Sequence, residues 1–272
     1  MTKPALQSHL AMACDTHGVS QVYRDLAVET AVAISINGTT HAVMMTSPSD
    51  LRDFAIGFAI TEGIITGLGQ IESLDIIEHD TGLEAQFWLA DDTARPFLAR
   101  RRAMAGPVGC GLCGIDSLDQ AVRPLPRLAD QGPTIDPHVI AAATDQLRAH
   151  QPLHDQTHAA HAAGFLTQDG SLVLAREDVG RHNALDKLIG AMIETNTAPS
   201  TGAIVLTSRV SVEMVQKTAI AGCAIIIAAS APTTHALKLA QDANITLCAS
   251  ARAGRFECYS HPFRLKGNEN VT

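Results

Sequence analysis

The strongest constraint on the fold is an alternation of apolar runs and helical patterns in the last third of the chain. Residues 203–207, 224–229 and 245–249 are apolar runs of strand length. Residues 210–221 and 233–242, which lie between these runs, are predicted helices. Strands that are apolar on both faces and alternate with helices predict a parallel sheet covered on both sides. Because aromatic residues make up only 4% of the 272 residues, Ala, Val, Ile, Leu and Met must fill this core.

The first half of the chain has the pattern of a smaller α+β unit. Val28 to Met45 alternates around Asn37-Gly38, which is a strong hairpin signal. Leu51 to Ala59 places apolar residues at helical spacing, and Gly63 ends that helix. A second hairpin is predicted between Leu74 and Leu89. Strands that pair around a helix indicate an α+β module.

The segment that joins the two halves is rich in proline. Residues 124–137 therefore predict a linker or a chain wrapped over a surface. Asp136-Pro137 provides an N-cap and a first-turn proline for a helix that runs to about His150. A hairpin over residues 162–175 is predicted to follow, before the alternating strands and helices.

We therefore expect an α/β protein in two parts. A smaller α+β domain is predicted over residues 22–105, and a larger α/β domain over residues 106–265. Residues 1–21 have mixed polarity without a period, so we predict a flexible tail there. Residues 266–272 are predicted to form a second tail.

Polar and basic residues follow each of the three apolar strands, and they define a candidate ligand site. Ligands of open α/β sheets bind beyond the carboxyl ends of the strands, and helix starts near residues 210 and 233 add backbone N–H donors there. Together these groups favour a phosphorylated, nucleotide-bearing ligand. For each residue alone, an N-cap or a solvated side chain is the simpler interpretation. The candidates at this edge are Ser208, Arg209, Ser250, Ala251, Arg252, Ala253, Gly254 and Arg255.

A second polar segment runs from Arg176 to Asn183, directly after a predicted strand and before a helix. Arg181 and Asn183, near the helix start, could hold a phosphate or a base edge, and Gly180 and His182 are further candidates for binding the ligand. An elaborate helix-capping loop is the alternative interpretation. Among the other histidines, we expect His158 to lie near the same site.

Cys110 and Cys113 form a Cys-x-x-Cys pair in a glycine-rich segment, and three interpretations compete. A zinc site needs two more ligands, which only the nearby histidines 154, 158 and 161 could supply. A dithiol redox couple is expected at a helix start, which this segment does not resemble. A nucleophilic thiolate that carries a persulfide sulfur on a loop fits the glycines best, and Arg100 to Arg102 could lower its pKa. The remaining cysteines are isolated in the sequence and predicted to be structural: Cys14, Cys223, Cys248 and Cys258.

Charge and hydropathy exclude several classes of protein. The net charge of −8 argues against binding to long nucleic acids. The longest apolar run, Ala219 to Ala231, is shorter than the ~20 residues that span a bilayer, so no membrane span is expected. The N-terminus lacks the pattern of a signal peptide. Six cysteines are too few for a disulfide scaffold of this length, and we expect a reducing, cytoplasmic location.

From about residue 22 to residue 265, the sequence resembles the FdhD family of accessory sulfurtransferases for molybdenum-dependent formate dehydrogenases. The strings that carry the resemblance are long and specific. They are residues 41–45 (HAVMM), 54–58 (FAIGF), 61–65 (TEGII), 109–114 (GCGLCG), 177–187 (EDVGRHNALDK), 208–209 (SR) and 213–217 (EMVQK).

The resemblance implies a sulfurtransferase that takes persulfide sulfur from a cysteine desulfurase. It would pass this sulfur to the bis-molybdopterin guanine dinucleotide cofactor, which formate dehydrogenase needs for activity. The persulfide cysteine of the family falls on Cys110, with Cys113 as its partner thiol. The alternative that we keep is a cofactor-binding chaperone that transfers no sulfur.

The resemblance also implies a fold, an assembly and a binding segment. The fold is a cytidine-deaminase-like three-layer domain preceded by a smaller α+β domain, in a homodimer without a metal of its own. A cofactor-binding stretch of the family falls on Ser250 to Arg255, where Gly254 and Arg255 match and Ser250 and Ala251 depart from common choices. The sequence lacks the His-x-Glu of a zinc deaminase, so the likeness to deaminases concerns the fold alone.

Overall fold

A six-stranded mixed sheet forms the centre of the larger part of the molecule. The computed structural model describes residues 4–94 and 124–268. The strand order is β12-β11-β10-β9-β7-β8, in which β9, β10 and β11 are parallel and the remaining pairs are antiparallel. The strands are β7 (His161–Thr167), β8 (Leu172–Asp178), β9 (Gly202–Leu206), β10 (Ile225–Ala228), β11 (Thr246–Arg252) and β12 (Arg255–Ser260). The three predicted parallel strands are confirmed, and antiparallel strands extend the sheet on both sides.

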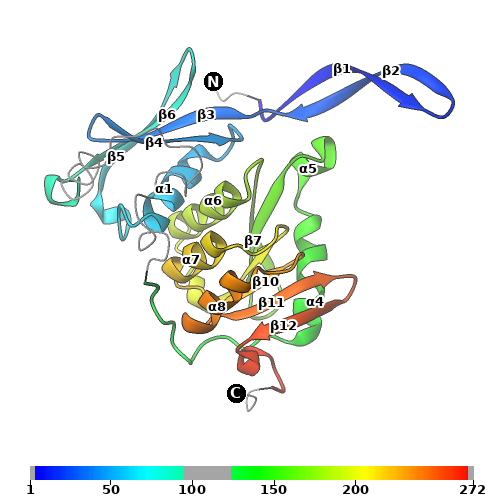
Figure 1. Cartoon of the computed structure of the whole chain (residues 1–272). Coiled ribbons are helices and arrows are strands. Elements are labelled where there is room, and N and C mark those ends of the chain that lie inside the picture. The colour runs from blue at the N-terminus through cyan, green and yellow to red at the C-terminus, as the bar shows by residue number, and fades with distance from the viewer. Residues whose placement is uncertain (1–3, 95–123, 269–272) are drawn as a thin grey trace.

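Helices cover both faces of this sheet, as the apolar strands predict. Helices α6 (Arg181–Glu194), α7 (Val212–Ala221) and α8 (Thr234–Asp242) lie on one face, and α4 (Pro137–Arg148) lies on the other (Figure 1). Consecutive side chains of β9 lie on opposite faces of the sheet. Ile204 belongs to the apolar cluster that includes α6, α7 and α8, and Val205 belongs to the cluster that includes α4. The expected three-layer α/β architecture is confirmed. A short helix α5 (Pro152–Thr157) follows α4, and three 3-10 turns span Leu68–Gln70, Pro199–Thr201 and Pro262–Arg264.

A four-stranded sheet forms the smaller part. Its order is β4-β3-β6-β5, and helix α1 (Leu51–Thr61) packs between it and α6. The strands are β3 (Thr30–Ile36), β4 (Thr39–Thr46), β5 (Ile71–His79) and β6 (Gly82–Leu89). Asn37 and Gly38 form the turn of the first hairpin with φ of 47° and 73°. Positive φ angles at both turn positions favour the Asn-Gly pair. Both predicted hairpins and the helix between them are confirmed.

One apolar core runs through both parts. Ile34 of β3, Phe54 of α1, Leu188 of α6 and Ile204 of β9 belong to the same cluster of buried side chains. The expected boundary at residues 105 and 106 lies outside the described residues, so the division into domains stays a prediction. None of the helices in the described ranges is long and apolar enough to cross a membrane.

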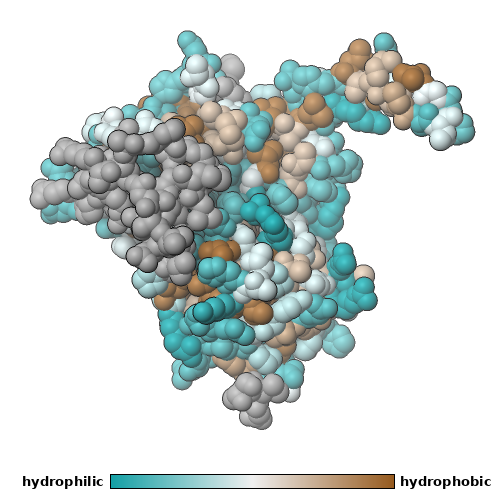
Figure 2. Space-filling view, viewed as in Figure 1, coloured by the Kyte–Doolittle hydropathy of each residue, from teal (hydrophilic) through white to brown (hydrophobic). Residues whose placement is uncertain are grey.

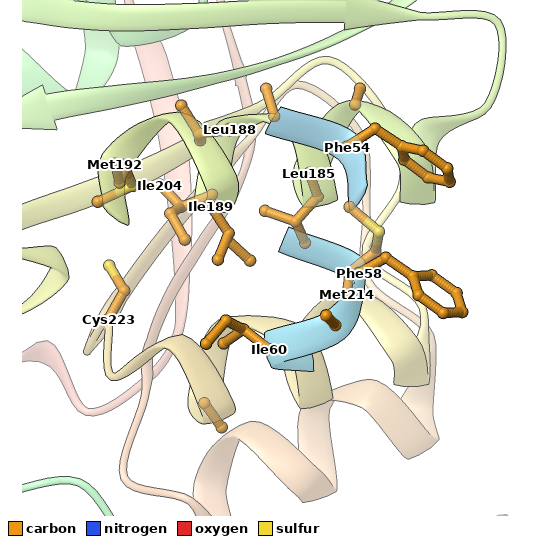
Figure 3. Packing of buried hydrophobic residues seen from close by; sticks show 14 of the residues in the cluster. Phe54, Phe58, Ile60, Leu185, Leu188, Ile189, Met192, Ile204, Met214 and Cys223 are labelled. Carbon is orange, nitrogen blue, oxygen red and sulfur yellow. The ribbon is translucent and has the colours of Figure 1, made fainter. Parts of the chain in front are cut away.

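Helices α1 and α6 cross so closely that their backbones touch. A Cβ atom at Gly57 would lie 1.8 Å from the carbonyl oxygen of Asp186, and one at Gly190 would lie 1.9 Å from the carbonyl oxygen of Asp53. No side chain fits at either distance, so the crossing requires glycine on both helices. Apolar side chains surround the crossing, and Figure 3 labels Phe54, Phe58, Ile60, Leu185, Leu188, Ile189 and Met192 among them.

A buried ion pair joins the same layer to α7. Lys217 Nζ lies 2.9 Å from both carboxylate oxygens of Asp186 and donates to Thr61 Oγ1 at 2.9 Å. Burial by itself would lower the pKa of Lys217, but the Asp186 and Glu62 carboxylates outweigh it and raise that pKa. Lys217 therefore stays charged within the core and connects α1, α6 and α7.

The N-terminal segment corrects one expectation. From Leu6 onwards, residues 1–21 are not an irregular tail, because β1 (Leu6–Asp15) and β2 (Gly18–Ala27) pair along their full length as an antiparallel ribbon. The ribbon projects away from the body of the molecule (Figures 1 and 2). Most of its side chains are exposed on both faces, so no polarity pattern of period two marks the strands. Its exposed apolar residues are Leu10, Met12, Val19, Tyr23 and Leu26.

The structure of the connecting segments agrees more closely with the predictions from the sequence. Residues 124–134 are irregular and are tied to the body where Leu128 N donates to the Ala243 carbonyl at 3.0 Å. Asp136 caps α4 by accepting from His138 N at 2.8 Å, as predicted. In the expected C-terminal tail, Lys266 N still donates to the Ile135 carbonyl at 3.0 Å. Arg100 to Arg102, expected to act on the cysteine pair, lie outside the described residues.

The glycine crossing predicts a steep cost for adding one methyl group. Gly57→Ala and Gly190→Ala should each lower the free energy of unfolding by about 1 to 3 kcal/mol or more, because a backbone has to move to admit the Cβ. Thermal and urea unfolding measure the change. Gly69→Ala is the control, since nothing lies within 4 Å of a Cβ there. Equal stability of all three variants would contradict the close crossing.

Candidate functional site

An open cavity of about 530 Å³ lies at the edge of the six-stranded sheet where the parallel strands end. Thr207 follows β9, Ala229 follows β10 and Arg252 ends β11, and all three line the cavity. This is the edge at which the sequence predicted a ligand site. The volume is in the range of small-molecule sites in proteins.

Helices α4 and α5 supply the opposite wall of the cavity. Thr144, Asp145 and Arg148 come from α4, and His154 comes from α5. The Arg148 guanidinium lies 2.5 Å from the Asp155 carboxylate, which orients it at the end of α4. The complete lining is Thr144, Asp145, Arg148, Gln151, His154, His158, Ala159, Ala160, His161, Thr207, Ala229 and Arg252.

A group of basic side chains surrounds His161, which begins β7 on the cavity wall. Burial lowers the pKa of His161, and the charges of Arg181, His154 and His182 lower it further. Arg181, His154 and His182 are therefore close enough to His161 to disfavour its protonated form by charge repulsion. A bound anion would relieve this repulsion, so the cluster favours a negatively charged ligand.

The start of α6 presents two of the predicted residues, Arg181 and His182. Arg181 Nε is buried and has no hydrogen-bond partner among the described residues. Arg181 is the first residue of α6, so backbone N–H groups of the first helical turn lie beside it. A buried guanidinium donor next to a helix N-terminus is a typical arrangement for binding phosphate.

The buried carboxylate of Asp178 holds this helix start in place. Its Oδ1 accepts from Gly180 N at 2.8 Å and from Asn183 Nδ2 at 3.0 Å. Its Oδ2 accepts from Ser47 N at 2.9 Å and from the Thr46 hydroxyl. One side chain therefore connects the start of α6 to the loop between β4 and α1.

Lys187 neutralises Asp178 in the core. Its Nζ lies 2.7 Å from Asp178 Oδ2, and both side chains are fully buried. The same ammonium donates to the carbonyl oxygens of Ser47 at 3.1 Å and Glu177 at 3.3 Å. Removing one member of such a pair leaves an uncompensated buried charge, which costs about 3 to 5 kcal/mol.

The segment from Arg176 to Asn183 thus divides between the two interpretations that the sequence left open. Asp178 is a capping and core group. Asn183, which was predicted to hold a phosphate or a base edge, is instead buried, and its amide donates to Asp178 and to the Met45 carbonyl. Glu177 caps α5, because its carboxylate accepts from Leu153 N at 2.7 Å and His154 N at 2.8 Å. Arg181 and His182 lie at the start of α6, and neither of them lines the cavity. The polar loop builds the framework that supports them.

Glu213, in the first turn of α7, faces His182. Glu213 Oε2 lies 3.5 Å from His182 Nε2 and accepts from the Ser211 hydroxyl at 2.8 Å. The interaction with His182 is the largest cause that lowers the pKa of Glu213 to about 2, with further contributions from Ser211 and its own backbone N–H. Glu213 is therefore ionised over the whole physiological pH range, and its charge orients His182 between α6 and α7.

The predicted binding stretch, Ser250 to Arg255, forms a hairpin between β11 and β12. The sequence predicted that this stretch follows the third strand. In the structure, Ser250, Ala251 and Arg252 lie within β11, and Arg255 begins β12. A register irregularity lies between Ala249 and Arg252, where Ser250 has a φ of 52°. The backbone there departs from regular pairing before the turn.

The side chains of this hairpin differ in their exposure. Arg252 is exposed and lines the cavity, and Arg255 is exposed without lining it. Ala251 is fully buried in the core on the α4 side, and its carbonyl accepts from Thr144 Oγ1 at 2.5 Å. Ala253 and Gly254 form the exposed turn with φ of 51° and 73°. The structure therefore brings Arg252 to the cavity, whereas the Ala251 side chain supports α4.

Ser208 and Arg209 follow β9. Ser208 is buried, and its hydroxyl donates to the Arg209 carbonyl at 3.0 Å. Arg209 is exposed, and neither residue lines the cavity. Thr207 does line it, with its hydroxyl accepting from Ala162 N at 2.9 Å.

The predicted cysteine pair, Cys110 and Cys113, lies outside the described residues. Within the described ranges, no group of three or more His, Cys, Asp and Glu side chains is arranged to hold a metal ion. That observation covers His154, His158 and His161, which are close in the sequence. The role of the cysteine pair stays a prediction.

Helix α4 contributes residues to the cavity that were not predicted from the sequence. Arg148, Asp145 and Thr144 form one wall of the cavity, and nothing in their local sequence distinguishes them from other helix residues. They reach the site because α4 packs across the face of the sheet opposite α7. His158 was expected near the site, and it does line the cavity.

The fold and the cavity define a class of protein: a three-layer α/β protein with an open cavity at the carboxyl edge of its sheet, lined by Arg148 and Arg252 among others. Residues 27–266 match the model of the FdhD/NarQ family. The chain belongs to this family.

Curated relatives named sulfur carrier protein FdhD cover most of the chain. The protein from Agrobacterium fabrum is 48% identical over 242 residues, which are 89% of each chain. The protein from Brucella abortus is 49% identical and covers 91% of this chain and 92% of its own. A crystal structure described as a formate dehydrogenase accessory protein from Desulfotalea psychrophila matches with a TM-score of 0.75 and 25% identity, over 96% of this chain and 100% of that one.

The depressed pKa of Glu213 predicts how its contribution to stability depends on pH. A carboxyl group whose pKa is lowered on folding stabilises the folded state above its unfolded pKa of about 4.5, and this contribution is lost as the pH falls towards about 2. Glu213→Gln should therefore reduce the free energy of unfolding at pH 7 by on the order of 1 kcal/mol, because partial exposure screens the interaction.

Urea unfolding of the Glu213→Gln variant and the wild type at several pH values measures this difference. The gap between them should narrow as the pH falls below about 4.5. Glu72→Gln, at an exposed position, is the control and should show no gap. A gap for Glu213→Gln that stays constant from pH 7 to pH 3 would contradict the assignment.

Proposed function

We propose that this protein is a sulfurtransferase that carries persulfide sulfur on Cys110. The sulfur comes from a cysteine desulfurase and is delivered to the bis-molybdopterin guanine dinucleotide cofactor of formate dehydrogenase. Membership of the FdhD/NarQ family and the name of the curated relatives support the sulfur-carrying part. The formate dehydrogenase accessory protein among the structural neighbours supports the recipient.

The observation that carries the ligand assignment is the basic cavity at the carboxyl edge of the sheet. A guanine dinucleotide is a polyanion through its pyrophosphate groups. Arg252 on the cavity wall and Arg181 at the start of α6 offer guanidinium donors, and the N-terminus of α6 offers backbone N–H groups. Donors of this kind are matched to phosphate oxygens in geometry and charge.

The chain is acidic as a whole, with a net charge of −8, so the site depends on local charge. Asp178 is fully buried and neutralised by Lys187, and Glu213 faces His182. Neither of these two carboxylates lines the cavity, where Asp145 is the acidic residue beside Arg148 and Arg252. This arrangement keeps Arg181 and Arg252 available to an anionic ligand.

Sulfur moves in two steps in this proposal. The Cys110 thiolate attacks the outer sulfur of the desulfurase persulfide, which forms the Cys110 persulfide and releases the desulfurase thiolate. Attack of the Cys113 thiolate on the inner sulfur then forms a Cys110–Cys113 disulfide and releases the outer sulfur as hydrosulfide for the cofactor. Alternatively, the reduced cofactor would take up the outer sulfur directly and supply the two electrons that convert it to a sulfido ligand, and Cys110 would return as a thiolate.

The remaining expectations belong to the same proposal. The protein acts in the cytoplasm, where reducing conditions maintain the Cys110 and Cys113 thiols. It works as a homodimer, it carries no metal of its own, and it binds no nucleic acid. The competing function is a chaperone that binds the cofactor and moves no sulfur.

Incubation with a cysteine desulfurase and cysteine should load one additional sulfur atom on Cys110. Intact-protein mass spectrometry detects the added sulfur, and cyanolysis releases it as thiocyanate. Cys110→Ala should lose both signals and the maturation of formate dehydrogenase while it still binds the cofactor. Cys14→Ala, which removes an exposed cysteine on the ribbon, is the matched control and should load normally. Normal maturation by Cys110→Ala would exclude the carrier role.

Arg252→Ala should weaken binding of an anionic nucleotide at the sheet edge. Loss of a charge-assisted hydrogen bond costs about 1.5 to 3 kcal/mol, which is about tenfold or more in Kd. Calorimetry of the full chain with guanosine diphosphate as the probe measures this effect. Arg255→Ala, in the same hairpin, should weaken binding and reduce cofactor retention during purification.

Arg24→Ala is the control for charge alone, because Arg24 is exposed on the ribbon and lines no part of the cavity. It should bind the probe like the wild type. An unchanged affinity of Arg252→Ala for guanosine diphosphate would contradict the placement of the ligand at this edge of the sheet.

A further inference from the structure

Two cysteines face each other on the hairpin that carries Arg252. Cys248 of β11 and Cys258 of β12 are register partners in an antiparallel pair. Directly opposite residues in such a pair have Cα atoms about 4.5 to 5.5 Å apart, which lies within the range that a disulfide spans. We propose that Cys248 and Cys258 form an oxidation-sensitive thiol pair that closes to a disulfide in the presence of a peroxide.

The two side chains lie on the same side of the sheet. Both pack with the cluster formed around Ile140 and Leu147 of α4, in which Cys248 is fully buried and Cys258 is partly buried. Both are free thiols. A disulfide can therefore form with little movement of the backbone.

The thiols also interact with each other. The hydrogen bond to Cys248 is the largest cause that lowers the pKa of Cys258, and the Ser260 carbonyl lies 3.4 Å from the Cys258 sulfur. The hydrogen bond with Cys258 and burial raise the pKa of Cys248 well above its ordinary value. Because Cys258 is the more exposed thiol and ionises first, it is the one that meets an oxidant.

The reaction balances with one molecule of hydrogen peroxide. The Cys258 thiolate attacks a peroxide oxygen, which breaks the O–O bond, forms a sulfenic acid and releases hydroxide. Cys248 then attacks the sulfenic sulfur, which forms the S–S bond and releases the hydroxyl group as water, together with the Cys248 proton. Two thiols and one peroxide give one disulfide and two molecules of water.

The disulfide would enclose residues 249–257, which include Ser250 to Arg255. Arg252 and Arg255 are themselves register partners at the tip of this hairpin. The bond would constrain the segment that presents Arg252 to the cavity. The formation of the bond does not depend on the ligand, so it can be tested separately from the proposed function.

Two other cysteines provide internal comparisons. Cys223 is fully buried, and burial raises the pKa of its thiol to about 11, so it should resist oxidation. Cys14 is exposed on the ribbon. Cys248 and Cys258 are not adjacent in the sequence and were predicted to be isolated. The pairing of β11 with β12 brings them together in the folded protein.

The full chain with Cys110→Ser and Cys113→Ser substitutions is treated with graded hydrogen peroxide. Remaining thiols are then alkylated, and peptides are mapped by mass spectrometry without reduction. We expect a peptide cross-linked through Cys248 and Cys258 and the joint loss of alkylation at both residues. Alkylation after denaturation should still find Cys223 as a thiol. A phosphine reductant should restore both thiols.

Cys258→Ala should abolish the cross-link and leave Cys248 reduced at the same peroxide dose, whereas Cys14→Ala should leave the cross-link unchanged. The proposal fails if Cys258 oxidises to a sulfinic acid without cross-linking. It also fails if both thiols stay reduced at doses that oxidise Cys14. If the disulfide forms but the affinity for guanosine diphosphate does not change, the thiol pair is confirmed, and an effect of the disulfide on ligand binding by Arg252 is excluded.

Discussion

The buried pair of Asp178 and Lys187 is the interaction on which the site and the fold both depend. Asp178 accepts hydrogen bonds from the start of α6 and from the loop between β4 and α1, and Lys187 neutralises it in the core at 2.7 Å. A fully buried carboxylate without this partner would be unstable in its charged form. The pair therefore fixes the start of α6, where Arg181 lies, and joins the two sheets through one network. The glycine contacts between α1 and α6 bring the layers close enough for this network to form.

The three-layer fold was predictable because burial leaves a strong local signal. Strands covered on both faces read as apolar runs, and Asn37-Gly38 and Asp136-Pro137 mark a turn and a helix start by their chemistry. The ribbon of β1 and β2 was missed because its side chains are exposed on both faces and show no alternation. The edge of the sheet that carries the cavity was also predictable, since strand ends share one edge, but of the residues predicted there only Arg252 lines the cavity. Arg148 and the wall from α4 depend on tertiary packing, and no local pattern records it.

The site shows how an acidic chain can present a basic surface to one small ligand. Its basic side chains gather around His161, whose pKa is lowered first by burial and then by the charges of Arg181, His154 and His182. Two nearby carboxylates are engaged, Asp178 with Lys187 and Glu213 with His182, and Asp145 is the acidic residue that lines the cavity. In our proposal, this edge holds the guanine dinucleotide while Cys110 brings the sulfur. Binding and sulfur transfer then belong to different segments of the chain, and each can be removed without the other.

Transfer of labelled sulfur tests the central claim most directly. The full chain is loaded by a cysteine desulfurase with radioactive cysteine sulfur, separated from the donor, and mixed with formate dehydrogenase whose cofactor lacks the sulfido ligand. Our account predicts that the label leaves Cys110, appears in the enzyme's cofactor, and restores formate oxidation in proportion to the sulfur transferred. Restored activity without transfer of the label would contradict it and would identify the protein as a chaperone.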